Sequence, residues 1–134
     1  MDEESYARAQ ALRQQVVGKS YVDRSIANTT EFNAPMQDLI VRYVWGEIWS
    51  RPELERKSRS IINLALLAAL QHPDELRLHV GGALRNGCSK AEIREVLLQV
   101  AVYCGVPVAL EAFRVVQDEL DRLGDESPAP EPAS

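Results

Sequence analysis

The apolar positions of this chain recur three and four residues apart over most of its length, which is the spacing of one face of an α-helix. No stretch alternates apolar and polar residues at a period of two, and no Asn-Gly or Asp-Gly pair lies between two strand-like runs. The pattern therefore predicts an all-α protein of about six helices.

Glycines, prolines and capping residues place the six predicted helices along the chain. They are expected over about residues 3–17, 33–49, 55–71, 73–86 and 89–104, with a sixth between Pro107 and Leu123. Residues 19–32 are polar and are expected to form a connector with only a short turn at residues 23–27.

Several residues define the ends of these helices. Gly18 and Gly87 are expected to end helices, Gly87 in the left-handed conformation. Asn33 is expected to cap the second helix. Ser89 and Glu92 have the spacing of a capping box, in which each side chain binds the backbone N–H of the other residue.

Two of the helices carry more apolar surface than a small bundle can cover. Residues 61–70 are apolar almost all round, and residues 96–104 are apolar on most faces. Six short helices cannot easily bury both segments, whereas a second subunit can. The sequence therefore predicts a homo-oligomer.

Composition and charge narrow the class of protein. The chain has 134 residues and a net charge of −5. We expect a single domain over residues 1–124 and a disordered, acidic, proline-rich tail over residues 125–134. The negative charge disfavours a nucleic-acid partner. The acidic start is unlike a signal peptide and the longest apolar run is too short to span a bilayer, so we expect a cytoplasmic protein without a membrane partner.

The two cysteines, Cys88 and Cys104, fit neither a disulfide scaffold nor the spacing of metal ligands. We expect both to be reduced thiols, with Cys104 in the core, and we expect no metal site.

The second predicted helix contains both tryptophans of the chain. Trp45 and Trp49 flank the carboxylate of Glu47, and Arg51 follows closely. At about 100° per residue, the apolar stripe of this helix is predicted to consist of Met36, Ile40, Val44 and Ile48. Glu47 lies at the edge of that stripe, one turn after Tyr43. Partial burial there would raise the pKa of the carboxyl group unless a cation compensates.

This arrangement has two readings. Glu47 is either one half of a structural ion pair with a nearby arginine, or a general acid or substrate-orienting group. Arg24, Arg51 and Arg59 are candidates for holding carboxylates, although most arginines are simply solvated surface. On the second reading, the segment from Trp45 to Arg51 forms one wall of a binding site for a small anion.

A histidine faces inward on the fourth predicted helix. Leu76, His79, Val80 and Ala83 recur at helical spacing, and Glu75 lies one turn before His79 as a possible orienting carboxylate. An inward histidine is more often a satisfied core residue than a catalyst, and both readings stay open.

Three motifs connect these residues to a known family. They are Trp-Gly-Glu-Ile-Trp-x-Arg-Pro at residues 45–52, Glu-Leu-Arg-Leu-His at residues 75–79 and Tyr-Cys-Gly-x-Pro at residues 103–107. With Val-Asp-Arg-Ser at residues 22–25, the chain resembles the 4-carboxymuconolactone decarboxylase family over about residues 4–123. The resemblance implies an all-α fold like that of alkylhydroperoxidase D and a homo-oligomer, commonly a hexamer.

The resemblance also implies a reaction, the cofactor-free decarboxylation of 4-carboxymuconolactone to 3-oxoadipate enol-lactone in protocatechuate catabolism, the β-ketoadipate pathway. The substrate, a lactone dicarboxylate, contains its own electron sink, so no cofactor is expected. An arginine would anchor its acetate arm, His79 would donate to the enolate oxygen, and Glu47 or His79 would supply the proton. Trp45 and Trp49 would border the pocket.

Two alternatives remain at this point. A thiol peroxidase of the same superfamily needs a Cys-x-x-Cys-x-x-x-His motif, where this chain has His72, Glu75 and His79 in place of the two cysteines and the histidine. A non-catalytic helical assembly protein would leave Glu47 and His79 in closed ion pairs.

Overall fold

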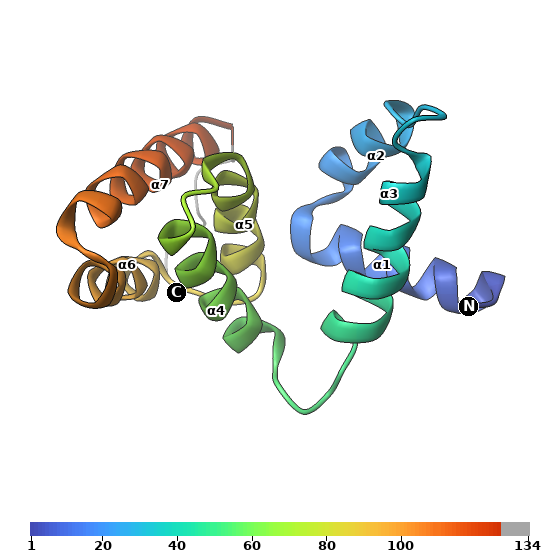
Figure 1. The fold of residues 1–134 in the computed structure, drawn as a ribbon, viewed down its shortest axis with the longest axis horizontal. Helices are drawn as coiled ribbons and strands as arrows, with labels where there is room; N and C mark the ends of the chain where they lie inside the picture. Colours follow the sequence, from blue (N-terminus) through green and yellow to red (C-terminus); the bar gives the residue numbers. More distant parts are fainter. Residues whose placement is uncertain (127–134) are drawn as a thin grey trace, which may run out of the picture. The chain divides into compact units, whose positions relative to one another are not determined.

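The computed structural model describes residues 1–126, which include the first two positions of the predicted tail; residues 127–134 lie outside the described part. The chain divides into two compact units, Met1–Arg59 and Ser60–Ser134, and each is described by itself. Every regular element of residues 1–126 is a helix, so the predicted all-α class is confirmed (Figure 1).

The first unit contains three α-helices and a π-helix: α1 (Glu3–Val17), α2 (Lys19–Ala27), α3 (Ala34–Leu39) and η1 (Ile40–Trp49). Helices α3 and η1 run on without a break and together correspond to the second predicted helix. Both α2 and η1 pack against α1. Helix α1 is therefore the central element of this unit.

The second unit contains the remaining α-helices: α4 (Arg56–Ala69), which begins at the end of the first unit, α5 (Pro73–Arg85), α6 (Lys90–Cys104) and α7 (Val106–Glu126). Helices α5 and α6 pack on α7. The core between them contains large side chains that are at most 2% exposed, namely Leu64, Leu76, Val80, Ile93 and Leu97.

Most of the predicted helix ends are confirmed. Gly18 and Gly87 both have a φ of 96°, a left-handed region that favours glycine. The Ser89 side chain accepts from the Glu92 N–H and the Glu92 side chain accepts from the Ser89 N–H, each at 3.0 Å, which completes the capping box. Asn33 is the N-cap residue of α3, as predicted, but its side chain accepts from the Thr30 N–H at 2.7 Å and makes no capping bond to the helix.

The predicted polar connector is wrong over residues 19–27, which form α2. Only one side chain of this helix, Val22, is fully buried, and α2 packs on α1. An ion pair between Lys19 and Asp23 at 2.6 Å bridges one turn on the exposed side. Val22 is thus the one well-buried side chain of a helix whose other apolar residues, such as Ile26, stay largely exposed, and so narrow a buried face gave no clear periodicity.

The predicted apolar stripe of the second helix is also wrong. The buried side chains of η1 are Val41, Trp45 and Trp49, whereas Met36 and Ile48 are exposed. Both sets of residues are apolar and spaced four apart. The two indoles carry far more apolar surface than the aliphatic set, so burying them against α1 determines which face points inward.

The apolar segments of the second unit are covered on one side only. In α4, Leu64 and Ala68 are buried while Ile62 and Leu66 are exposed, and Leu70 directly after the helix is exposed too. The predicted burial of Cys104 is wrong, because α6 is buried only as far as Val100 and Cys104 lies beyond that point; the buried cysteine is Cys88.

None of the helices in residues 1–126 is both long enough and apolar enough to cross a membrane.

Candidate functional site

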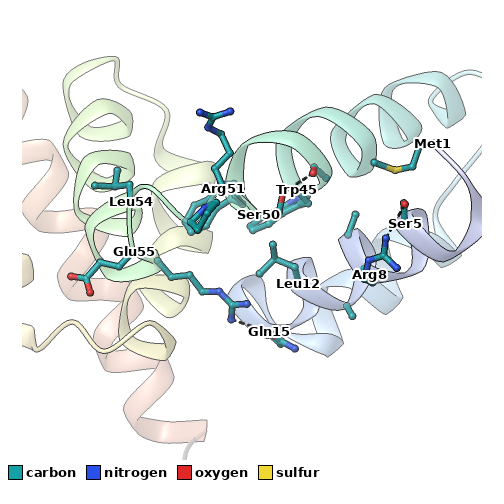
Figure 2. Close-up of a pocket in the computed structure, with 16 residues that line it drawn as sticks. Met1, Ser5, Arg8, Leu12, Gln15, Trp45, Ser50, Arg51, Leu54 and Glu55 are labelled. Carbon is teal, nitrogen blue, oxygen red and sulfur yellow. Dashed lines mark hydrogen bonds between the residues drawn. The ribbon is translucent and has the colours of Figure 1, made fainter.

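A pocket of about 730 Å³ lies in the first unit between α1, η1 and the loop after η1. We call it the Trp–Arg pocket, after the side chains that give it its chemistry: Trp45, Trp49, Arg8, Arg51 and Arg56. Figure 2 shows Arg8 and Gln15 on the α1 side and Trp45 and Ser50 on the opposite side.

The two indoles form the apolar part of this pocket. Their ring centroids are 4.9 Å apart with an angle of 28° between the planes, so the rings stack. Trp45 and Trp49 are only 3% and 6% exposed, respectively, and Leu12 of α1 is buried beside them in the lining. A rigid, mostly dry surface of this kind strengthens any charge interaction made next to it.

Three guanidinium groups make the pocket electropositive. Arg8 donates to Ser5 Oγ at 2.9 Å, and Arg56 donates to Gln15 Oε1 at 2.8 Å. Arg51 lies 3.9 Å from Glu53, both side chains being more than half exposed. The lining contains one carboxylate, Glu55. With three cations and one anion, the pocket is suited to a ligand carrying more than one carboxylate.

Gly46 is one of the residues that line the Trp–Arg pocket. A Cβ atom at this position would lie 2.4 Å from Met1 Cε and 3.2 Å from the Val41 carbonyl oxygen. The Met1 thioether therefore occupies the space beside Gly46 in this chain.

The structure places three of the predicted site residues in this pocket, Trp45, Trp49 and Arg51. Three others in the same unit lie outside its lining. Tyr43 is 54% exposed on η1. Arg24 is exposed on α2 and donates to Ser20 Oγ at 3.3 Å. Arg59 is half-buried and donates to the Arg51 carbonyl oxygen at 3.3 Å.

Sequence reasoning missed two of the three cations, Arg8 and Arg56. A signal for Arg8 was present, because Ser5, Arg8, Leu12 and Gln15 are three and four apart and share one face of α1. Arg56 gave no such signal, since it reaches the pocket from the start of a different helix by bonding Gln15.

Glu47 is exposed on η1. The expected partial burial of its carboxylate is therefore wrong for the single chain, because the inward face of η1 is the indole face. Within residues 1–126 no arginine forms an ion pair with Glu47, so the structural ion-pair reading is not found either.

His79 faces the core of the second unit, as predicted. It is 7% exposed beside Leu76, Val80 and Ala83, which are 0–2% exposed. Burial lowers the pKa of the imidazole from 6.5 to about 4, because the charged form loses its solvation. His79 is therefore neutral at pH 7.

Glu75 lies one turn before the buried His79 on α5, as predicted. Its carboxylate is exposed. Its role in orienting the imidazole stays a prediction. Glu47 and His79 belong to different units, so their convergence on one substrate also stays a prediction.

A family model describes most of this chain. The model of the carboxymuconolactone decarboxylase family matches residues 34–118, which run from the start of α3 into α7. The chain belongs to the carboxymuconolactone decarboxylase family. The matched segment contains His79, Glu47 and both indoles of the Trp–Arg pocket.

Two relatives of this chain are decarboxylases by name. The 4-carboxymuconolactone decarboxylase of Acinetobacter baylyi is 38% identical over 123 residues, covering 92% of each chain. The nitrosuccinic acid decarboxylase npaB of Metarhizium robertsii is 42% identical over 114 residues, covering 85% of this chain and 80% of the fungal one. An uncharacterised 15.0 kDa protein of Paracoccus denitrificans is 30% identical over 76 residues, about half of each chain.

Proposed function

We propose that this protein is a carboxy-lyase that decarboxylates 4-carboxymuconolactone to 3-oxoadipate enol-lactone. The observation that carries the proposal is the match to the Acinetobacter enzyme, which extends over 92% of both chains. The electropositive Trp–Arg pocket supports it, because the substrate is a dicarboxylate.

The substrate chemistry defines what the protein has to supply. The ring carbon that loses CO2 carries a carboxylate and an acetate arm. When its bond to the carboxylate breaks, the electron pair moves through the ring alkene to the lactone carbonyl oxygen. A proton then adds to the ring carbon next to that carbonyl. The site must hold the acetate arm, stabilise the enolate and deliver one proton.

We assign the first task to the Trp–Arg pocket. Arg8, Arg51 or Arg56 would bind the acetate carboxylate with paired N–H groups, and Trp45 and Trp49 would line the apolar side of the ring. The indoles exclude water from one face of the ligand, which strengthens the ion pair.

We assign the second task to His79. A neutral imidazole has one N–H group, which can donate a hydrogen bond to the enolate oxygen. Burial keeps His79 neutral at pH 7. Because its pKa is low, His79 is not an imidazolium at pH 7 and is a poor candidate for the proton donor. Glu47 is then the better candidate for the acid, provided that substrate or another subunit covers its exposed carboxylate.

The fungal relative favours a second candidate substrate. Nitrosuccinic acid also has a carbon that carries a carboxylate, a CH2-carboxylate arm and an electron sink, here the nitro group. Because the fungal enzyme is 42% identical to this chain, nitrosuccinate decarboxylation is the alternative activity.

The test compares both substrates on the purified full chain by following CO2 release. We expect 4-carboxymuconolactone to give the higher kcat/KM. Acceleration of nitrosuccinate alone would replace the proposed substrate, and no acceleration of either would remove the proposed function.

Pocket variants then test the assigned anchor. Arg8→Gln and Arg51→Gln should each raise KM for the lactone by about tenfold or more with little change in kcat, because a charge-assisted bond contributes about 1.5–3 kcal/mol to binding. Arg94→Gln on the exposed face of α6 is the matched control and should leave KM unchanged. Unchanged KM in both pocket variants and in Arg56→Gln would place the acetate arm elsewhere.

A further inference from the structure

A second arginine-lined pocket lies on another face of α1. Its volume is about 800 Å³ and its lining includes Gln10 and Arg13 of α1, Gln37 of α3 and Glu31 of the preceding loop. We call it the Arg13 pocket. It shares no lining residue with the Trp–Arg pocket.

Arg13 is the most unusual residue of the first unit, because its side chain is charged and only 3% exposed. Its guanidinium donates to Gln10 Oε1 at 3.5 Å, to Ser25 Oγ at 3.2 Å and to Gln37 Oε1 at 3.4 Å. The ring centroid of Tyr21 lies 5.9 Å from Cζ of the same group.

All of these partners are neutral. Within residues 1–126 no carboxylate forms an ion pair with Arg13. Fully buried arginines are almost always paired with a carboxylate or other anion, because an unpaired buried cation is costly. The three bonds are also long, since charge-assisted N–H···O bonds normally measure about 2.7–2.9 Å. The guanidinium is thus held in place but incompletely neutralised.

The opening of this pocket has the opposite charge. Glu31 is exposed there, and Asp38 also lines the pocket, where it is ion-paired with Arg42 at 2.9 Å. A ligand that carries a second negative charge would meet the Glu31 carboxylate on its way to Arg13. Ile26, Pro35 and Val41 supply apolar wall between the two ends.

We propose that the Arg13 pocket is a binding site for a monocarboxylate with an apolar body, whose carboxylate pairs with the buried Arg13 guanidinium. Gln10 and Gln37 already bond Arg13 and line the pocket, so each can turn its amide N–H toward the incoming carboxylate. The site is separate from the decarboxylation pocket and would hold an effector acid. It does not depend on the proposed activity.

The test uses three probes on the full chain, measured by titration calorimetry at fixed pH. Benzoate has one carboxylate and an apolar ring, benzamide is its neutral counterpart and succinate is a dicarboxylate. We expect benzoate to bind, with benzamide at least about tenfold weaker. Succinate can also bind in the Trp–Arg pocket, so only the part of its binding that Arg13→Met removes is compared, and we expect that part to be at least about tenfold weaker as well. Equal binding of benzoate and benzamide would overturn the proposal.

Variants locate the bound benzoate. Arg13→Met keeps the length of the side chain and should abolish benzoate binding, whereas Arg51→Gln in the Trp–Arg pocket should leave it unchanged. The reverse result would place benzoate in the Trp–Arg pocket and overturn the proposal.

Glu31→Gln provides an independent measurement if Arg13→Met does not fold. Glu31 is exposed, so this variant should fold normally, and it should tighten succinate binding several-fold at low salt by removing the charge at the opening. Glu111→Gln, an exposed change on α7, is the control. No gain for succinate in Glu31→Gln would contradict the proposed route to Arg13.

An acidic side chain of a second copy of the chain is the other possible source of the carboxylate. In that case wild-type protein would not bind benzoate and Arg13→Met would lower the mass measured by light scattering. That pair of results would overturn the ligand site in favour of a subunit contact.

Discussion

At the scale of single residues, burial lowers the pKa of the His79 imidazole. If it donates to the enolate oxygen, His79→Leu should lower kcat by about 10²–10³, the effect of removing one oxyanion donor. Leucine fills a similar buried volume, so the variant should stay folded. His72→Leu changes the exposed histidine of the chain and should leave kcat near wild type. Normal turnover in folded His79→Leu would remove His79 from the mechanism.

The same residue makes stability depend on pH. The folded pKa of about 4 lies below the ordinary 6.5, so the unfolded chain binds the proton more readily between these values. His79 therefore lowers the free energy of unfolding as pH falls from 6.5 towards 4, and leaves it unaffected above 6.5. The loss between pH 7 and pH 4.5 is about 2 kcal/mol.

Urea unfolding at the two pH values measures this contribution. On acidification, the free energy of unfolding of wild type and of His72→Leu should fall by an amount that includes the contribution of His79. The free energy of unfolding of His79→Leu should fall by about 2 kcal/mol less. An equal loss in all three proteins would mean that His79 is not buried in the folded state. The comparison needs one fixed protein concentration if subunits associate.

Sequence reasoning at this scale worked where local spacing was sufficient. Helical periodicity correctly turned His79 inward with Leu76 and Val80. It could not give the environment of Glu47, because that depends on which of two apolar faces of η1 packs on α1. The position of Arg56 in the pocket could not be predicted either, because it depends on a hydrogen bond to Gln15 of another helix.

At the scale of helices, the capping box before α6 is the best-defined local feature. Ser89→Ala removes the oxygen that accepts from the Glu92 N–H and should lower the free energy of unfolding by about 1 kcal/mol. Ser20→Ala on the exposed side of α2 is the control and should change it by less than about 0.5 kcal/mol. Equal effects of the two changes in denaturant titrations would show that the cap is not formed in solution.

Helix positions were the most predictable part of the fold. The predicted range of residues 3–17 matches α1, and the predicted ends at Gly87 and Ser89 match α5 and α6 closely. These ends are fixed by single residues with a strong backbone preference. The helix over residues 19–27 could not be predicted, because its formation depends on the packing of Val22 on α1.

At the scale of the whole molecule, exposed apolar side chains predict self-association. In α4, Ile62 is 46% and Leu66 51% exposed, and Leu70 just after it is 65% exposed; in α6, Val102 is 77% and Tyr103 79% exposed. Leaving these side chains in water is unfavourable by about 25 cal/mol for each Å² of apolar surface, which burial by another subunit would recover. We expect a stable oligomer at micromolar concentration, with a mass measurable by light scattering.

A charged variant tests this face. Leu66→Glu should lower the oligomer mass while circular dichroism stays helical, because Leu66 is half exposed in the single chain. Gln117→Glu adds the same charge at an exposed position of α7 and should leave the mass unchanged. A wild-type monomer at micromolar concentration would contradict the predicted association.

Helix α1 lies outside the segment that defines the family, since the family match begins at residue 34. It nevertheless supplies Arg8 to one pocket and Arg13 to the other. If both arginines bind acids as proposed, the shared segment and the acid-binding side chains are partly separate in this chain. Substitutions in the first helix would then change which acids bind while residues 34–118 keep the helical framework.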